Sequence, residues 1–418
     1  MTSTLLARWV PGAGALAAGD RFRGALALAI CASQIALWLW RGPRLAAALT
    51  GEPADLSVAA WGSLALFIAG WRLGLRGRQA AGKTPSEDGP WAGAWQRFGQ
   101  ARAARLGLLA CAGYMAVALL APALSPHDPN RIGDGVATHS LPPLTRLHLV
   151  RMRDGSSVAA NAIDLDGEEI RLLRGRVWTS VHRSRLQGTR PSDWHRRQLH
   201  ILGTDRLGRD LLSRLLVGSR VSLGVGLLAA FLATTLGALV GGCAGWAGRR
   251  LDGALMRLAD ATLSIPRLFL LLLVLTVLPG SFAAVVIVLG ATGWMGPSRL
   301  VRAQILALRE QEFVQAARAA GRRGVGIVAR HLLPHAMAPL LVATTLMVAD
   351  TMLVEAGLSF LGLGVPPPHA TWGNLISGGR PDLVEGWWIS TFPGLAIVGA
   401  VIAFHLVGDG LRRALGGR

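Results

Sequence analysis

Residues 311–335, "QEFVQAARAAGRRGVGIVARHLLPH", are rich in helix-forming residues but too highly charged to span a membrane. The run from Glu312 to Ala320 predicts a short helix of small side chains, because alanine has the highest helix propensity. Gly321 predicts a turn after it. A second short helix, "GIVARHLL", is expected to stop at Pro334, since proline cannot continue a helix. Two short helices joined at a glycine lie along a membrane surface or dock on another protein.

Long apolar segments flank this stretch on both sides. Apolar residues make up 51% of the 418 residues and charged residues only 16%, whereas a soluble domain carries about a quarter charged residues. Apolar runs of this length are typical of an all-α protein embedded in a bilayer. We predict eight membrane-spanning helices, near residues 24–41, 57–73, 104–124, 219–246, 258–279, 281–298, 336–363 and 388–408.

The net charge of +19 is arranged as in a membrane protein, not as in a nucleic-acid-binding protein. Arginines gather in four segments between or after the apolar runs, at 72–105, 249–257, 299–330 and 412–418. Because cytoplasmic loops carry an excess of arginine and lysine, these segments predict that both chain termini are cytoplasmic. We expect the lipid bilayer as a partner and no nucleic acid.

Residues 125–200 form a long loop on the external side in this topology. The loop is also rich in arginine, but loops longer than about 60 residues translocate largely regardless of charge. The stretches "LTRLHLVRM" and "EEIRLLRGRVW" alternate apolar and polar residues, and "DLDGEE" is typical of a turn. We therefore predict a small external insert that contains strands.

The stretch "GRQAAGKT", residues 77–84, matches the spacing of a phosphate-binding loop, and Lys83 is the only lysine in the chain. Such a loop works only where a buried strand leads through it into a helix N-terminus. Here an apolar segment precedes the stretch and "PSEDGPWAG" follows it. We predict a basic cytoplasmic connector that does not bind ATP.

The spacing within 311–335 resembles the EAA loop of importer-type ATP-binding-cassette (ABC) permeases, and more specifically that of dipeptide, oligopeptide and nickel importers. Similar stretches follow in the family's order at 202–227, 245–266, 297–321, 354–376 and 392–415. Gln315 stands where the family usually has an acid. The residues that match the coupling loop are Glu312, Gln315, Ala316, Ala317, Gly321, Ile327, His331 and Pro334.

The resemblance implies a six-helix permease core, preceded here by two extra transmembrane helices. The expected divisions are an N-terminal extension at 1–100, the first core helix at 101–124, the external insert at 125–200 and the remaining core at 201–418. The implied partners are a second permease chain, two cytoplasmic ATPase subunits and an external solute-binding protein. The chain itself is then a transport subunit and not an enzyme. It needs no cofactor, because ATP and magnesium belong to the ATPases.

Small residues recur every four positions in the 219–246 segment, at Gly237, Gly241 and Gly245. This spacing favours close helix packing over a direct role in lining the pathway. In the 336–363 segment, Asp350 and Glu355 carry charge where it is costly. For these two acids we favour polar contacts between helices over substrate binding, although a pathway role stays open.

Near the external face, "GTDRLGRD" places Asp205, Arg209 and Asp210 before the predicted interfacial helix "LLSRLL". Capping and ion pairing are expected there, and contact with a binding protein is an equal alternative. His331 and His335 are four residues apart, but Pro334 between them argues against a metal site.

Two other classes of function remain open at this stage. A secondary transporter would need a relay of intramembrane charges, and a membrane-embedded enzyme would need a catalytic cluster within the spans. Within the apolar segments the available acids are Asp260, Asp350 and Glu355, and we find no catalytic cluster. The cargo is not determined by the sequence: peptides, nickel complexes, opines and sugars travel through similar permeases.

Overall fold

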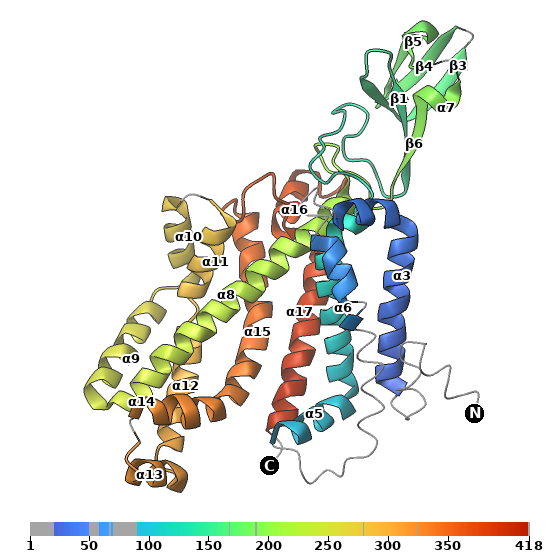
Figure 1. Ribbon diagram of the computed structural model, residues 1–418. Coiled ribbons are helices and arrows are strands. Elements are labelled where there is room, and N and C mark those ends of the chain that lie inside the picture. Colours follow the sequence, from blue (N-terminus) through green and yellow to red (C-terminus); the bar gives the residue numbers. More distant parts are fainter. Residues whose placement is uncertain are drawn as a thin grey trace, which may run out of the picture. The chain divides into compact units, whose positions relative to one another are not determined.

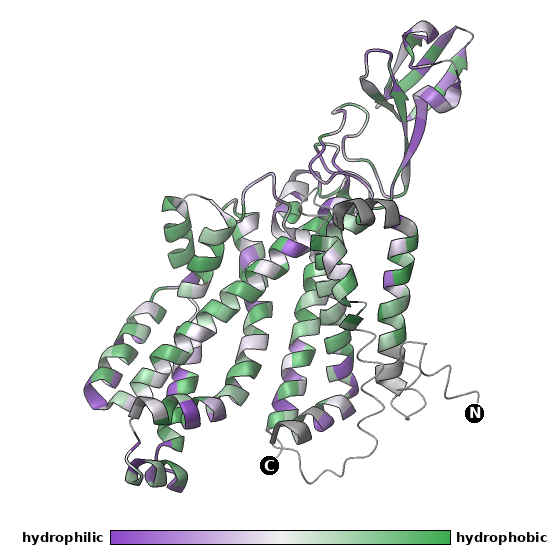
Figure 2. Cartoon of the chain, in the orientation of Figure 1, coloured by the Kyte–Doolittle hydropathy of each residue, from purple (hydrophilic) through white to green (hydrophobic). Residues whose placement is uncertain are grey.

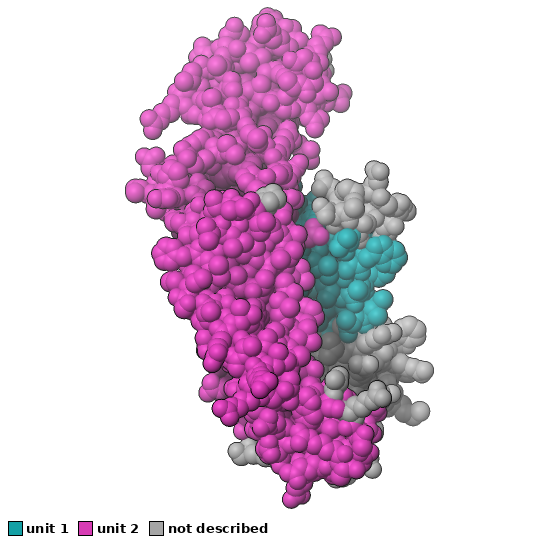
Figure 3. Space-filling model, turned by 90° about the vertical axis from the view of Figure 1, so that its left-hand side faces the viewer, with its two compact units in different colours: residues 1–96, 112–126 teal, residues 97–111, 127–418 magenta. Residues whose placement is uncertain are grey.

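The computed structural model describes residues 21–49, 58–66, 68–69, 90–166, 168–188, 190–278, 280–322 and 324–416. The phosphate-loop-like stretch 77–84 lies outside these residues. The chain divides into two compact units, which are coloured separately in Figure 3. One unit comprises residues 1–96 and 112–126, and the other comprises residues 97–111 and 127–418.

Helices dominate the described part of the chain, as its apolar runs predict (Figure 1). Four of these helices are long and apolar enough to cross a bilayer, and Figure 2 shows hydrophobic residues along most of their length. They coincide with the predicted spans 104–124, 219–246, 336–363 and 388–408. The four helices are α6 (Arg102–Leu124), α8 (Leu211–Ala247), α15 (Leu333–Phe360) with the preceding turn, and α17 (Trp387–Leu415).

The predicted spans at 258–279 and 281–298 are wrong as single helices. In the first region α9 (Arg249–Leu263) and α10 (Arg267–Val277) meet at 84°. Pro266 explains the break, because it lacks a backbone N–H and disfavours helical geometry in the residue before it. In the second region α11 (Phe282–Ala291) and α12 (Met295–Leu308) meet at 41°. Counting each bent pair as one span raises the number of candidate spans to six among the described residues.

The first unit contains α3 (Arg21–Leu49), which covers the predicted span 24–41 and is apolar over Ala27–Leu39. A second helix, described over 58–66, covers part of the predicted span 57–73. The indole Nε1 of Trp38 donates to Ser63 Oγ at 3.1 Å. The apolar core of this unit is formed by Leu37, Leu45, Ala59, Ala60, Leu120 and Ala123.

Helix α8 is the central element of the second unit and packs against α11, α12 and α15. At a rise of about 1.5 Å per residue, the length of this 37-residue helix far exceeds the thickness of the hydrocarbon core of a bilayer. Gly237, Gly241 and Gly245 face α12, where a Cβ added to Gly245 would lie only 2.8 Å from Ile305 Cβ. The core between α8, α10, α11 and α15 contains Val225, Ala229, Leu271, Leu275, Val285, Val288, Leu289 and Leu358.

Residues 145–200 contain two three-stranded antiparallel sheets, which confirms the prediction of an insert with strands. Their orders are β2-β1-β6 and β3-β4-β5. The predicted turn in "DLDGEE" joins β3 to β4, with Asp166 paired to Glu169. The strands are β1 (Thr145–Arg151), β2 (Ser157–Ala160), β3 (Ala162–Asp166), β4 (Glu169–Arg174), β5 (Val177–His182) and β6 (His195–His200).

Short helices connect the longer elements. In the insert and before the core these are η2 (Arg183–Arg185), α7 (Pro191–Trp194) and α5 (Pro90–Gln100). Within the core they are α13 (Glu312–Ala319), α14 (Gly324–Ile327), the π-helical turn η3 (Val328–Leu332), α16 (Trp372–Gly379) and η4 (Arg380–Asp382).

Candidate functional site

Helix α13 is held against the core by one apolar side. Val314 is fully buried in a cluster with Ile305 of α12, Ile327 of α14 and Leu332 of η3. The chain then reverses at Gly321, whose φ of +75° is a conformation that residues with a side chain rarely adopt. The predicted pair of helical segments around Gly321 is therefore present.

The exposed residues of α13 are mainly small or polar, with Phe313 as a large apolar side chain among them. Glu312, Gln315 and Ala316 are exposed, and Ala317 is half-buried against the apolar cluster. Gln315 donates from Nε2 to the carbonyl of Glu310 at 3.2 Å. Ala316 and Ala319 add little side-chain bulk at exposed positions of this helix, which permits another protein to approach closely there.

The prediction that Pro334 stops the second helix is wrong. The chain continues from α14 through η3 into α15 without a break, and Pro334 lies in the first turn of α15. The backbone N–H of Leu333 donates to the carbonyl of Val328, five residues earlier. This wider π turn accommodates a residue that cannot donate an N–H of its own. His331, half-buried, lies in the same turn.

One contact fastens α13 to the end of α8, and another fastens the preceding helix α12 to the start of α9. The Arg318 guanidinium of α13 lies 4.7 Å from the centroid of the Trp246 ring at the end of α8. Arg302 of α12 forms a two-bond ion pair with Asp252 of α9, with Nη2 2.6 Å from Oδ2. A displacement of α13 therefore acts on helices that belong to the core.

Glu355 is enclosed between helices. Its side chain is buried, and Oε1 accepts a hydrogen bond from Ser359 Oγ at 2.7 Å within α15. Ser222 Oγ of α8 lies 3.5 Å from Oε2 and donates to it. The same Ser222 hydroxyl accepts a hydrogen bond from the backbone N–H of Trp372 at 3.0 Å. The carboxyl group thus joins α15, α8 and the first turn of α16.

Asp350 is in a different setting, because its side chain is 61% exposed. Its Oδ2 lies 3.1 Å from Arg267 Nη1, at the start of α10. Arg267 also lines a pocket of about 240 Å³ at the two helix breaks, together with Pro266 and Gly293. The same chain bends that interrupt the predicted spans therefore create a cavity with a cationic group at its wall.

Comparison with known proteins identifies the family. Residues 233–418 match the family model described as binding-protein-dependent transport system inner membrane component. Residues 89–143 match the N-terminal transmembrane domain of oligopeptide transport permease C. A peptide transport system permease protein of Brucella suis is 46% identical over 216 residues, which are 52% of this chain and 73% of that protein. The chain belongs to this permease family.

Two relatives from Bacillus subtilis agree on the family. The oligopeptide transport system permease protein OppC of Bacillus subtilis is 41% identical over 216 residues, covering 52% of this permease and 71% of OppC. The dipeptide transport system permease protein DppC of the same organism is 37% identical over 217 residues, which are 52% of this permease and 68% of DppC. A chain of the methionine ABC transporter MetNI, solved in inward-facing conformations, aligns with a TM-score of 0.39 and 22% identity over 48% of this chain and 95% of its own.

Membership of this family makes the chain a multi-pass inner-membrane subunit of an ABC transporter. It is a transport subunit and not an enzyme, and ATP hydrolysis takes place on separate ATPase subunits. The expectations of ATPase partners and of a second permease chain follow in general form from the same membership.

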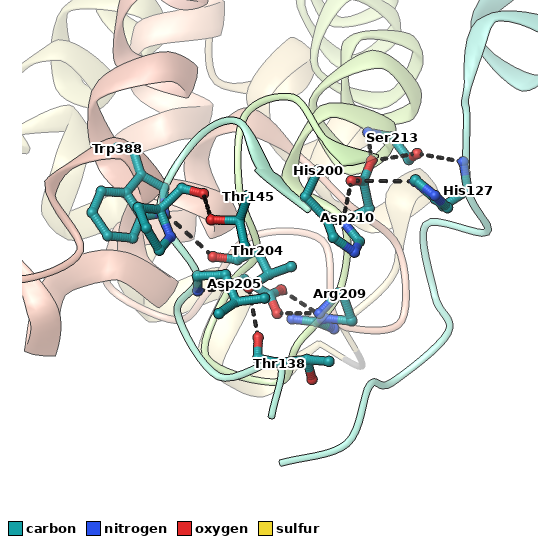
Figure 4. Close-up of polar contacts among 12 residues, drawn as sticks. His127, Thr138, Thr145, His200, Thr204, Asp205, Arg209, Asp210, Ser213 and Trp388 are labelled. Atoms are coloured by element: carbon teal, nitrogen blue, oxygen red, sulfur yellow. Dashed lines mark hydrogen bonds and ion pairs between the residues drawn. The ribbon is translucent and has the colours of Figure 1, made fainter. Parts of the chain in front are cut away.

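The "GTDRLGRD" segment of the permease folds into a tight turn before α8 (Figure 4). Asp205 Oδ1 accepts from the backbone N–H groups of Leu207 and Arg209, both at 2.9 Å, and its Oδ2 lies 2.7 Å from Arg209 Nε. The buried Arg214 guanidinium lies 3.5 Å from the same carboxylate. Gly208, with φ of +69°, meets Thr138 so closely that a Cβ has no room.

Asp210 is the N-cap of α8 and accepts from the backbone N–H of Ser213 at 2.8 Å. The predicted interfacial helix "LLSRLL" is not separate, because it forms the first turns of α8. His200 Nδ1 lies 2.8 Å and His127 Nδ1 3.4 Å from Asp210 Oδ1. Burial alone would raise the pKa of Asp210, but the interactions with His127, His200 and Ser213 outweigh it and hold that pKa well below its usual range.

Sequence reasoning missed His127 and His200. They are 73 positions apart, and His200 is ten positions before Asp210, so no short ligand-spacing pattern relates the three residues. The turn before α8 brings His200 to Asp210, and the hydrogen bond from the His127 backbone N–H to Ser213 Oγ places His127 beside them. Both histidines lie at the ends of the predicted insert 125–200, and this position is the sequence signal that could have pointed to them.

Proposed function

We propose that this permease forms half of a translocation pathway for peptides and couples to its ATPase subunits through residues 311–335. The observation that carries the proposal is the exposed small-residue side of α13, at Gln315, Ala316 and Ala319, in a chain of this family. Alanines allow the close backbone approach that docking into a groove requires. The names of the peptide permease relatives support peptides as cargo.

The continuity through Pro334 suggests how movement is transmitted. Helix α13 follows α12 after a short turn, while α14 runs through η3 into α15. Closure of an ATPase dimer against α13 would therefore move both α12 and α15. A π-helical turn, as found in η3, is frequent at functional sites. In this mechanism ATP binding favours one of two packings of the core helices.

The proposed architecture has six core spans, formed by α6, α8, the α9–α10 pair, the α11–α12 pair, α15 and α17. Two further N-terminal spans, in α3 and around the helix at 58–66, precede them. Both termini are cytoplasmic, in keeping with the arginine-rich segments. The divisions at 1–100, 101–124, 125–200 and 201–418 follow from this arrangement.

The partners complete the transporter. A second, different permease chain forms the other half of the pathway, and a solute-binding protein docks on the external side, where "GTDRLGRD" and the insert are available. ATP and magnesium bind to the ATPase subunits, and transport requires no cofactor on this chain. The role of Gly237, Gly241 and Gly245 is close packing of α8 on α12.

The pocket at the helix breaks supports a role in the pathway. Arg267 supplies a positive charge at its wall, and Asp350 is exposed beside it. A charged side chain in a membrane segment usually faces a cavity or a partner. We place both residues on the pathway, whereas the enclosed Glu355 serves contact between helices.

The substitution Ala316→Glu tests the coupling function. A glutamate on the exposed side of α13 adds bulk and charge at the proposed ATPase contact, so we expect peptide uptake by the assembled transporter to fall at least tenfold. The matched control is Ala254→Glu, at an exposed position of α9. Uptake of a labelled dipeptide and peptide-stimulated ATP hydrolysis are measured together in proteoliposomes.

Membrane insertion and complex assembly of both variants are checked by gel filtration. Normal uptake by the Ala316→Glu transporter would contradict the coupling function. A parallel uptake panel of dipeptides, oligopeptides and nickel tests the cargo, and a response to nickel alone would exclude peptides as the main substrate.

A further inference from the structure

Three side chains of metal-ligating types converge at the start of α8, as Figure 4 shows. His127 follows α6, His200 ends β6, and Asp210 caps α8. One potential ligand atom from each residue lies within 4.8 Å of the other two. The side chains of Asp210 and His200 are 1% and 6% exposed, and that of His127 is 21% exposed. The cluster is enclosed by protein, with access to solvent on the His127 side.

The hydrogen bonds of Asp210 direct one carboxylate oxygen towards both imidazoles. Ser213 donates to Oδ2 from its backbone N–H at 2.8 Å and from its hydroxyl at 2.7 Å. Oδ1 is left facing the Nδ1 atoms of His200 and His127. The backbone N–H of His127 in turn donates to Ser213 Oγ at 3.1 Å. Ser213 thus fixes the Asp210 carboxylate, as outer partners orient metal ligands, and it also holds the backbone of His127.

The Nδ1 atom of His127 is buried but has no hydrogen-bond partner among the described residues. Its 3.4 Å distance from Asp210 Oδ1 is too long for a good hydrogen bond. A buried polar atom left without a partner costs the folded protein stability. A cation between Nδ1 and the carboxylate would remove this cost, because a neutral imidazole presents a lone pair there.

We propose that His127, His200 and Asp210 bind a divalent transition-metal ion of the zinc class. Imidazole nitrogen and carboxylate oxygen are zinc ligands at about 2.0–2.2 Å, which places neighbouring ligands of a tetrahedral site about 3.3 Å apart. The 3.4 Å separation of His127 from Asp210 is close to this value, and the 2.8 Å separation of His200 from Asp210 needs a slight opening. The two imidazole rings are stacked with centroids 4.9 Å apart and planes at 27°, so one ring must rotate for both Nδ1 lone pairs to meet one ion. The fourth position, on the His127 side, is taken by water.

The ion would link the insert to the start of α8 more firmly than the hydrogen bonds among these side chains do alone. His127 and His200 lie at the two ends of the external insert, and Asp210 belongs to the start of α8. One ion bound to all three therefore fastens both ends of the insert to the first turn of a core helix. This function is separate from translocation, so its test does not depend on the cargo or on the ATPases.

The test measures metal binding by the full chain, purified in detergent without a polyhistidine tag. The protein is stripped with a chelator, dialysed, and titrated with zinc chloride, and the bound zinc is counted by mass spectrometry. We expect about one zinc ion per chain, and the cobalt-substituted protein to show the visible absorption of a tetrahedral site. Zinc should also slow hydrogen exchange at the backbone N–H of His127.

The variants His127→Gln and His200→Gln should each weaken zinc binding at least tenfold, since each removes a ligand. His139→Gln, at an exposed histidine of the insert, is the matched control and should bind as the wild type does. Asp210 is left unchanged because its substitution would also remove the cap of α8. The cobalt spectrum of the wild type decides the matter if both variants fail to fold.

Any of the following results would overturn the proposal: less than about half an equivalent of zinc on the wild type, a cobalt spectrum typical of octahedral coordination, or unchanged binding by a folded His127→Gln variant. Zinc that binds equally well to all three histidine variants is adventitious and also overturns it.

Discussion

Replacing Gly241 with alanine tests whether α8 and α12 depend on backbone contact. A Cβ on Gly241 would overlap the carbonyl oxygen of Ser298 and lie 3.0 Å from the backbone nitrogen of Arg302. Backbone atoms cannot rotate away, so the helices must separate, and overpacking of this kind costs about 1–3 kcal/mol. Gly242 supplies the control, because a Cβ there would meet its nearest neighbour, Val328 Cγ1, only at 4.0 Å. Both substitutions gain a similar helix propensity, about 0.8–1 kcal/mol. The difference in stability between the two variants therefore reports the contact of residue 241 with α12.

The assay is thermal unfolding of the detergent-solubilised chain, followed by tryptophan fluorescence. We expect Gly241→Ala to have a Tm several degrees below that of Gly242→Ala, since 1 kcal/mol corresponds to roughly 2–4 °C for a large domain. Gly245→Ala should also have a Tm below that of Gly242→Ala, because its neighbour at 2.8 Å is Ile305 Cβ, which is fixed to the backbone of α12 and cannot rotate away. If Gly241→Ala and Gly242→Ala unfold at the same temperature, the packing role of the glycines is refuted.

Three further outcomes are expected. A cysteine at the exposed position Ser156 of the insert should react with a membrane-impermeant thiol reagent added to intact cells; labelling only after lysis would invert the topology. Lys83→Ala should leave the ATPase activity of the assembled transporter unchanged, and ATP binding by the isolated chain that disappears with this substitution would show that residues 77–84 form a phosphate site. Arg267→Gln should lower peptide uptake about tenfold while Arg267→Lys retains most of it, because a hydrogen bond to a charged group contributes about 1.5–3 kcal/mol. Equal uptake by the wild type and both Arg267 variants would place that side chain outside the pathway.

The coupling stretch shows how far local sequence patterns extend. Helix propensity predicted α13, and the glycine at 321 predicted the turn after it, where the structure has a φ of +75°. The end of the following helix was predicted wrongly at Pro334. Proline removes one hydrogen bond, but whether a helix stops or continues past it depends on the neighbouring helices, here on the apolar cluster that holds Ile327 and Leu332.

The two bent helix pairs show what hydropathy leaves undetermined. Mean hydropathy predicted apolar segments at 258–279 and 281–298, and those segments are apolar and helical. Hydropathy averages over a window of residues and is insensitive to direction, so it did not reveal the 84° bend at Pro266 or the 41° bend near Gly293. The pocket beside Arg267 exists only because of these bends.

Amino-acid composition and local patterns predicted a multi-pass membrane protein, a strand-containing insert and the positions of α6, α8, α15 and α17, while the family followed from the resemblance of several stretches to ABC permeases. These features depend on interactions among residues close together in the chain, or on the transfer of apolar segments out of water. The tertiary structure decided which residues meet across long separations. His127, His200 and Asp210 come together, Glu355 is enclosed and Asp350 is exposed, because such contacts depend on how distant segments pack in three dimensions.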